Sequence, residues 1–291
     1  MKNIVLMPNA YKDKGYEVTR IVVQALQSHG ACVCISDRLR DEIALDGIHY
    51  YSGDLPQDAD VILVIGGDGS VLDAAEYAIA ANLPLIGLNL GRVGYLAELN
   101  MEEISNLSRL VSNDFEIREY ITLAVSIVRG GEETALTRCA VNDVVLSQAE
   151  GEGLSEILLD DGVGDQFSYL ADGIIVATPL GSTAYSLAAG GPIVDTTLDS
   201  FCVTPICAHS LFSRSILFSP DNIITLKNCS KREGNMRLSV DGGEGYTLAP
   251  GEYVRVCRSD RRLRMITLKK HSALGVLCRK MQLLNLQTRK D

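Results

Sequence analysis

The sequence of 291 residues predicts an α/β domain built on a parallel sheet, followed by a β-rich domain. In the first part, apolar strand-like runs alternate with helix-like segments, an order typical of a parallel sheet covered by helices. From about Glu116 the pattern changes to short alternating runs separated by turn signals, which indicates many short strands. A chain of this length is large enough for two hydrophobic cores.

The predicted elements follow from hydrophobic periodicity. In the first part we expect strands at 3–7, 31–35, 61–65 and 83–88, and helices at 16–28 and 71–78. In the second part we expect strands at 121–128, 140–146, 156–159, 174–177, 223–226, 236–240, 253–257 and 263–268.

A last helix is predicted near the C-terminus, where leucines and a methionine recur at helical spacing. We expect this helix, at 270–291, to return to the first domain. The predicted domains are therefore 1–100, together with the returning helix, and the β-rich segment 101–269.

Composition limits the class of protein. Hydrophobic residues make up 46% and charged residues 22%, which is ordinary for a globular enzyme. The net charge of −10 argues against a nucleic-acid partner. No segment resembles a signal peptide or a membrane span, and the eight cysteines are scattered, so we expect a cytoplasmic protein with no membrane partner.

The most informative stretch joins the strand at 61–65 to the helix that follows it, through Gly66-Gly67-Asp68-Gly69-Ser70. Glycines let backbone amides approach a ligand, and a helix N-terminus favours phosphate. Asp68 would repel phosphate there unless it meets a metal, a hydroxyl or a proton to be moved. The stretch therefore favours phosphoryl transfer, and the alternative is a plain strand-to-helix turn.

The motif TPLGSTAYSLAAGGP predicts a turn and a short helix, with Ser182 as the N-cap and Gly190 at the C-terminal end. The small residues Thr183 and Ala184 would let a flat aromatic group approach the backbone, and Tyr185 could stack on it. The alternative is a capped helix that packs in the core without a ligand.

Two polar residues, Asn142 and Asp143, interrupt an apolar strand. An amide suits a base edge, and a carboxylate suits paired ribose hydroxyls. The alternative is a bulge or turn at a strand edge. Asp241-Gly242-Gly243 predicts a hairpin turn by the same turn chemistry.

Taken together and in order, the motifs resemble those of the NAD kinase family. They are GGDGS at 66–70, LGRVGYL at 90–96, Asn142-Asp143, Asp172-Gly173, and TPLGSTAY at 178–185 with GGP at 190–192. GGDG also occurs in phosphofructokinases and lipid kinases, whereas the TPxGSTAY segment is far more specific. The chain has neither a P-loop nor a GxGxxG fingerprint.

The resemblance implies transfer of a phosphoryl group from ATP, or from polyphosphate, to the 2′-hydroxyl of the adenosine ribose of NAD, giving NADP. It implies an N-terminal α/β domain and a β-rich C-terminal domain with NAD bound between them, in a homodimer or homotetramer whose neighbouring subunit helps to complete the site. Mg²⁺ would enter with ATP, since the sequence has no side-chain metal motif of its own.

Carried over onto this sequence, the family pattern makes Asp68 the proton acceptor. The residues expected to face ATP and its phosphates are Gly66, Gly67, Gly69 and Ser70. The residues expected to bind NAD are Asp68, Gly69, Tyr95, Asn142, Asp143, Asp172, Thr183, Ala184, Tyr185 and Ala188. The chain departs from the family's usual residues at Asp143 (usually Glu), Leu170 (Arg), Leu180 (Thr) and Ala188 (Ser). These departures affect the finer contacts with the ligand and the preference for NAD or NADH.

Two alternatives remain open at this point. A lipid kinase of the diacylglycerol or sphingosine type shares GGDG and predicts an apolar substrate channel, whereas Asn142, Asp143 and Asp172 suit hydroxyl groups. A non-catalytic nucleotide sensor could use the same scaffold, but it has no need for a carboxylate beside phosphates.

Overall fold

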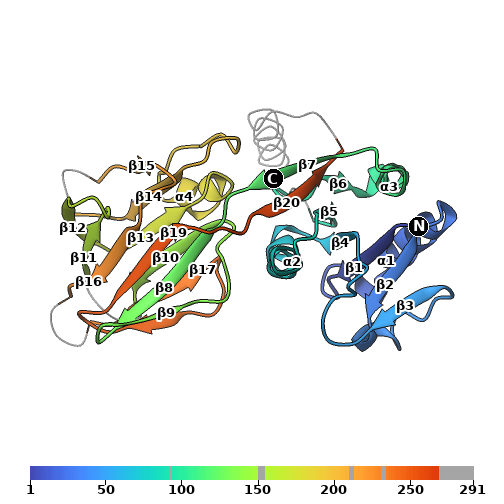
Figure 1. Cartoon of the computed structure of the whole chain (residues 1–291), viewed down its shortest axis with the longest axis horizontal. Helices are drawn as coiled ribbons and strands as arrows, with labels where there is room; N and C mark the ends of the chain where they lie inside the picture. The colour runs from blue at the N-terminus through green and yellow to red at the C-terminus, as the bar shows by residue number, and fades with distance from the viewer. Residues whose placement is uncertain (92–93, 150–154, 210–212, 231–233, 269–291) are drawn as a thin grey trace, which may run out of the picture. The chain divides into compact units, whose positions relative to one another are not determined.

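The computed structural model describes residues 1–91, 94–149, 155–209, 213–230 and 234–268. The described chain forms two compact units, labelled by their elements in Figure 1. The first unit contains Met1–Glu119 and, far along the chain, strand β20 (Leu263–Thr267), and the second unit is Tyr120–Arg262. The predicted helix at 270–291 lies outside the described residues.

A mostly parallel sheet forms the centre of the first unit, as the sequence predicts. Its order is β3-β2-β1-β4-β5-β20-β7, and β6 pairs with β5. The strands besides β20 are β1 (Asn3–Pro8), β2 (Cys32–Ser36), β3 (Ile48–Tyr51), β4 (Val61–Gly66), β5 (Leu85–Asn89), β6 (Leu99–Asn100) and β7 (Glu116–Tyr120). The chain runs outward from β1 to β3, then returns to β4 on the other side of β1, so the strand order reverses between β1 and β4.

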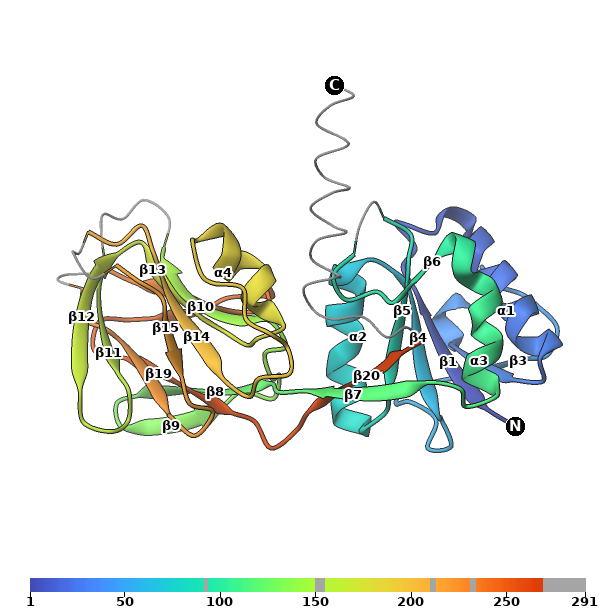
Figure 2. The same cartoon turned by 90° about the horizontal axis from the view of Figure 1, so that it is seen from above.

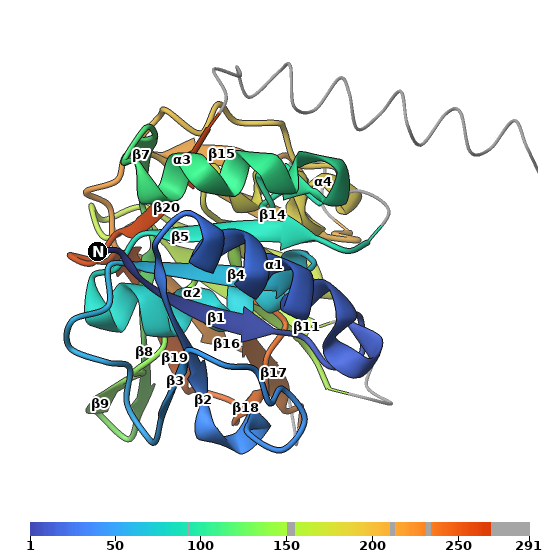
Figure 3. The same ribbon diagram turned by 90° about the vertical axis from the view of Figure 1, so that its right-hand side faces the viewer.

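Helices cover both faces of this sheet (Figures 2 and 3). They are α1 (Glu17–Ser28), α2 (Asp68–Ala81) and α3 (Leu107–Val111), with 3₁₀ turns η1 (Lys14–Tyr16), η2 (Asp37–Leu39) and η3 (Met101–Asn106). Helices α1 and α3 share one core with Ile86 and Leu88 of β5. Gly87 points to the opposite face, where Val71 of α2 packs closely against it.

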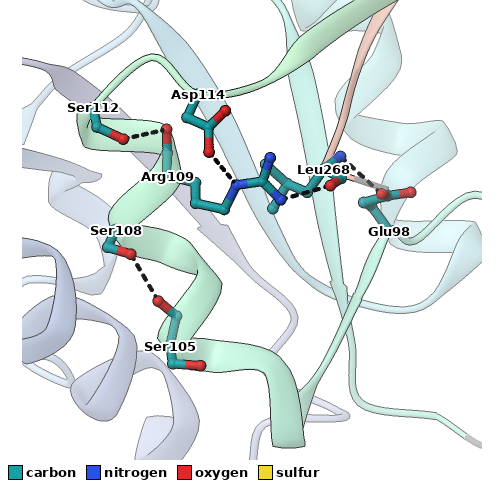
Figure 4. Close-up of polar contacts among 7 residues, drawn as sticks. All are labelled: Glu98, Ser105, Ser108, Arg109, Ser112, Asp114 and Leu268. Carbon is teal, nitrogen blue, oxygen red and sulfur yellow. Dashed lines mark hydrogen bonds and ion pairs between the residues drawn. The ribbon is translucent and has the colours of Figure 1, made fainter. Parts of the chain in front are cut away.

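Strand β20 is held in the first unit by polar contacts at its end (Figure 4). Glu98 accepts hydrogen bonds from the amide of Leu268 at 2.8 Å and from the hydroxyl of Thr267 at 3.1 Å. Arg109 of α3 donates to the carbonyl oxygen of Leu268 at 2.6 Å and also pairs with Asp114. The return of the chain is therefore fixed to both the loop after β5 and helix α3.

The division between the units differs from the sequence-based boundary at 100/101. Residues 101–119 and the strand predicted at 263–268 belong to the first unit. The reason is that β20 pairs with β5, with Met265 opposite Leu85. An alternating pattern identifies a strand, but it does not identify a partner so distant in the sequence.

Two six-stranded antiparallel sheets form the second unit. Their orders are β15-β14-β13-β10-β17-β18 and β12-β11-β16-β19-β8-β9. The strands are β8 (Leu123–Arg129), β9 (Glu132–Ala135), β10 (Asp143–Gln148), β11 (Ser155–Asp160), β12 (Gln166–Ala171), β13 (Gly173–Ala177), β14 (Phe201–Ile206), β15 (Ile216–Phe218), β16 (Ile224–Asn228), β17 (Met236–Val240), β18 (Tyr246–Leu248) and β19 (Tyr253–Arg258).

The two sheets share one core, to which Val144 and Val176 contribute from one sheet and Leu226 and Val254 from the other. Alternate residues of β10 and β13 point away from this core. There they pack with Ala189, which follows 3₁₀ turn η4 (Gly181–Thr183) and helix α4 (Tyr185–Ala188). The motif TPLGSTAY is thus placed on the outer face of one sheet.

None of the helices in the described part of the chain combines the length and the apolar character that a membrane crossing requires.

Gly87→Ala is expected to destabilise the first unit. A Cβ at this position would lie 2.9 Å from Cγ2 of Val71 and 3.0 Å from Cα of Ala97, so the helix or the loop must shift. Such overpacking costs about 1–3 kcal/mol, measurable as the free energy of unfolding in urea. Gly69→Ala is the matched control, since no neighbouring atom lies within 4 Å of its Cβ position. Equal losses in both variants would contradict the close packing of α2 on β5.

Candidate active site

Three loops meet where the strand order of the first unit reverses. They follow the carboxyl ends of β1, β4 and β5, the edge of a parallel sheet where ligands bind. The amide of Asn9 donates to the carbonyl of Ile65 at 2.8 Å, and the amide of Leu90 donates to the carbonyl of Gly66 at 2.7 Å. The turn at 66–70 is therefore tied to the loop on either side of it.

Asp68 is the first residue of α2, and its carboxylate is held by two backbone amides. The amide of Tyr95 donates to Oδ2 at 2.6 Å and that of Leu96 donates to Oδ1 at 3.0 Å. A carboxylate has about four lone-pair sites, so others remain for a ligand hydroxyl. A Cβ on Gly94 would lie 2.7 Å from Oδ1 of Asp68, so glycine at 94 lets these amides reach the carboxylate.

Asn9 and Lys12, in the loop after β1, contact the turn, and the sequence did not predict either contact. Asn9 donates from Nδ2 to Oγ of Ser70 at 2.7 Å. The Cβ position of Gly67 lies only 2.1 Å from Nζ of Lys12, so glycine there leaves space for the ammonium group. The available signal was their place directly after the first strand, beside the switch point.

In the second unit, β10 begins at Asp143, and Asn142 lies in the bend just before it, so the two residues mark a strand edge and do not interrupt a strand. A carboxylate from the β17–β18 hairpin organises them. Asp241 accepts from the amides of Val141 and Asn142, both at 2.7 Å, and of Asp143 at 3.0 Å. Its own amide donates to the carbonyl of Asp143 at 2.9 Å. The hairpin turn predicted at Asp241 is confirmed, and it also fixes the backbone of this loop.

The Asp143 side chain is 5% exposed and accepts no hydrogen bond from the described residues. Burial, and then the charge of Asp241, raise its pKa from 3.8 to about 7. Burial also raises the pKa of Asp241, but three backbone amides and Arg138 act in the opposite direction. Of the two carboxyl groups, Asp143 is thus the one that takes up a proton near neutral pH.

The TPLGSTAY segment packs directly on the Asn142 loop. Thr178 donates through its hydroxyl to the carbonyl of Val141 at 2.6 Å and through its amide to that of Asn142 at 2.8 Å. A Cβ on Gly181 would lie 2.0 Å from the carbonyl oxygen of Asn142, so glycine at 181 permits this contact. The structure therefore brings the two polar motifs of the second unit together.

The sequence predicts Ser182 as the N-cap of the helix, and this prediction is wrong. It lies within η4, where its buried hydroxyl donates to the carbonyl of Pro179 at 2.7 Å and accepts from the amide of Val194 at 3.0 Å. The hydroxyl is used to fix the segment after the helix, a partner that sequence spacing does not reveal. Gly190 adopts the expected left-handed conformation, with φ of 89°.

The predicted NAD-binding residues of this segment are accessible to different degrees. Tyr185 is 47% exposed, although it is a large aromatic residue. Ala188, three residues later on the same face of α4, is also exposed, whereas Thr183 and Ala184 are half-buried. The ring of Tyr185 and the side chain of Ala188 are therefore the accessible members of this set.

Asp172 does not lie with the other predicted NAD-binding residues of the second unit. In the antiparallel pair of β10 and β13, Asp143 is opposite Ala177, whereas Ser147 is opposite Gly173. Asp172 precedes Gly173, so it lies at the far end of this strand pair from Asn142 and Asp143.

Comparison with known proteins identifies the family. The ATP-NAD kinase N-terminal domain model matches residues 4–115, and the ATP-NAD kinase C-terminal domain model matches residues 141–268. An NAD kinase from Thermoanaerobacter sp. (strain X514) is 33% identical over 278 residues, which are 95% of this chain and 98% of the relative. One from Agathobacter rectalis is 36% identical over 287 residues, 97% and 99% of the two chains. The chain belongs to the NAD kinase family and is an enzyme, so the resemblance is confirmed.

Solved structures show the same fold. The chain is similar to yeast NADH kinase complexed with NADH, with a TM-score of 0.81 and 22% identity over 92% of this chain and 84% of that one. It is also similar to an NAD kinase from Archaeoglobus fulgidus in complex with ATP, with a TM-score of 0.69 and 21% identity over 93% and 95% of the two chains. The predicted fold class is thereby confirmed.

The raised pKa of Asp143 predicts a pH-dependent stability. The folded chain binds this proton more tightly than the unfolded chain, so the stabilisation is complete below pH 3.8 and is lost as pH rises through about 7. Asp143→Asn removes the titration. Relative to the wild type, the variant should gain about 2.5 kcal/mol between pH 5 and pH 8, measured by urea unfolding at both pH values. A difference that does not change with pH would contradict the burial of this carboxyl.

Asp241→Asn is expected to destabilise the Asn142 loop, because an amide group presents N–H donors to backbone amides that need acceptors. Asn tolerates the left-handed backbone at this position, where φ is 48°, so the change isolates the carboxylate. We expect a loss of about 1–3 kcal/mol in urea unfolding. Asp221→Asn is the control, since this exposed residue pairs only at the surface with Arg258 and should lose less than about 1 kcal/mol.

Proposed function

We propose that this enzyme transfers the γ-phosphoryl group of ATP to the 2′-hydroxyl of the adenosine ribose of NAD, with Asp68 as the proton acceptor. A bond forms between the ribose oxygen and the γ-phosphorus, and the bond from that phosphorus to the leaving oxygen of ADP breaks. The hydroxyl proton passes to the carboxylate of Asp68. The products are NADP and ADP.

The observation that carries this proposal is the fixed carboxylate in the glycine turn. A ribose hydroxyl is a poor nucleophile, so catalysis depends on positioning and charge stabilisation. The amides of Tyr95 and Leu96 orient the carboxylate of Asp68 without occupying all of its acceptor sites. A proton acceptor held in this way contributes about 10²–10⁴-fold to the rate.

The remaining predicted residues take the following roles in the proposal. In the first unit, Gly66, Gly67, Gly69 and Ser70 face the donor phosphates, and Tyr95 lies near the adenine. In the second unit, Asn142 and Asp143 bind the adenosine part of NAD, and Thr183, Ala184, Tyr185 and Ala188 line the adenine region. The exposed ring of Tyr185 supports this, because an unburied aromatic side chain offers a surface for stacking.

In the proposal Asp172 also contacts a dinucleotide, but not the one that Asn142 and Asp143 of the same chain bind. Since it lies at the far end of the β10–β13 pair from Asn142, we assign it to the NAD site of a neighbouring copy. This is consistent with a homodimer or homotetramer.

Magnesium enters the proposal with the donor. The described residues contain no group of three His, Cys, Asp or Glu that could form a metal cage. The oxygen-rich turn at Asp68 suits instead a Mg²⁺ bound mainly by phosphate oxygens and water, the usual manner for this ion. When bound, Mg²⁺ offsets the negative charge of the phosphates.

The test is the conversion of NAD by the purified enzyme with ATP and Mg²⁺, detected with an NADP-specific dehydrogenase. Asp68→Asn keeps the size of the side chain and removes the base, so we expect turnover to fall by about 10²–10⁴-fold. Asp73→Asn is the matched control, since Asp73 is an exposed carboxylate on the same helix.

Retention of near wild-type turnover by Asp68→Asn would refute the role of Asp68. Absence of NADP from the wild-type reaction would refute the proposed reaction itself. Exchanging ATP for polyphosphate and NAD for NADH in the same assay identifies the preferred donor and acceptor.

A further inference from the structure

The ammonium group of Lys12 lies against the phosphate-binding turn. The Cβ position of Gly67 is 2.1 Å from Nζ of Lys12, and that of Gly91 is 3.5 Å from it. Lys12 belongs to the loop after β1, Gly67 to the turn after β4 and Gly91 to the loop after β5. One cation therefore reaches all three loops at the switch point of the sheet.

The backbone that carries Lys12 is fixed on both sides. Asn9 accepts from the amides of Tyr11 at 3.0 Å and Lys12 at 3.2 Å, while its Nδ2 donates to Ser70. Asp13 is 2% exposed and accepts from the amides of Val18 and Thr19. The loop is thus anchored to the glycine turn at one end and to helix α1 at the other.

Neither nearby carboxylate neutralises this lysine. Asp13 is directed at the first turn of α1, and Asp68 at the amides of Tyr95 and Leu96. Among the described residues, Lys12 forms no ion pair, and its side chain is exposed. A solvent-accessible ammonium without a carboxylate partner, placed over a glycine turn, is available to an anionic ligand.

We infer that Lys12 binds the phosphates of the donor, an inference that rests on the proposed function. The need for a cation follows from charge. The chain carries a net charge of −10, and one of its carboxylates, Asp68, lies inside the turn where the polyanionic donor binds in the proposal. Backbone amides supply only partial positive charge, whereas a lysine supplies a full one and is a common ligand of phosphate. Gly67 and Gly91 lack the side chains that would block its approach.

The first experiment measures binding without turnover, with inorganic tripolyphosphate and Mg²⁺ as the probe in isothermal titration calorimetry. Lys12→Met should weaken binding about tenfold or more relative to the wild type. Lys12→Arg keeps the charge and should stay within about threefold of the wild type. Lys14→Met, which removes an exposed lysine two residues further along, is the control and should leave the affinity unchanged.

The second experiment separates the donor from the acceptor in steady-state kinetics. Lys12→Met should raise the KM for ATP about tenfold, while the KM for NAD changes less than about twofold. Equal increases in both KM values would overturn the assignment. So would tripolyphosphate affinity that is unchanged by Lys12→Met, equally weakened by Lys14→Met, or undetectable in the wild type.

The two proposals fail in different ways. If the wild type makes no NADP, the proposed reaction is wrong, and the calorimetric comparison still decides whether Lys12 binds phosphate. If NADP is made and the Lys12 variant behaves as the wild type in both experiments, only the role of Lys12 is wrong. Thermal unfolding of each variant confirms that the exposed substitution leaves the fold intact.

Discussion

Hydrogen bonding between β1 and β4 decides where the charged groups of the first unit meet. These two strands are adjacent and parallel although 52 residues of sequence separate Pro8 from Val61. Their carboxyl ends lie side by side at the point where the strand order reverses. The loop with Asn9 and Lys12 follows one strand, and the turn with Asp68 follows the other. A shift in this pairing would move the loop that carries Lys12 relative to the turn that carries Asp68, so the positions of both groups depend on the sheet.

Backbone amides and carboxylates play reciprocal parts in the two units. In the first unit, consecutive amides of Tyr95 and Leu96 orient the side chain of Asp68. In the second unit, the side chain of Asp241 orients three consecutive amides, so that Asn142 and Asp143 are presented at a strand end. Hydrogen bonds from N–H groups offset part of the hydration that a buried carboxylate loses.

Local patterns predicted much of this molecule. The buried run before Gly66 and the glycines after it identified the strand and the helix that follows, because each depends on residues close in sequence. The same holds for the hairpin at Asp241 and for the end of α4 at Gly190. The helix α2 begins at Asp68, three residues before the predicted start at 71, so Asp68, Gly69 and Ser70 belong to its first turn and not to a separate turn before it. The motifs also indicated the family, which the comparisons confirm.

What the sequence did not reveal depends on contacts between distant segments. The place of β20 in the first sheet requires its pairing with β5, and the role of Ser182 requires Val194. Asn9 and Lys12 carry no motif of their own, since a lysine in a polar loop is ordinary until the sheet places it beside Gly67. The sheet topology, and not the residue type, determines where these side chains lie and what they contact.

The net negative charge of the chain restricts how a polyanionic donor can be attracted to the proposed site. A protein with a net charge of −10 repels a polyanion at long range, so its attraction must come from groups within a few ångströms. In the proposal, the amides at the start of α2 and the ammonium of Lys12 are such groups. Asp68 is the only acidic residue of the sequence at 66–70. Its hydrogen bonds to Tyr95 and Leu96 direct it, and they spread part of its charge onto the backbone. In the proposed mechanism, the turn therefore combines an anion-binding surface with a proton acceptor.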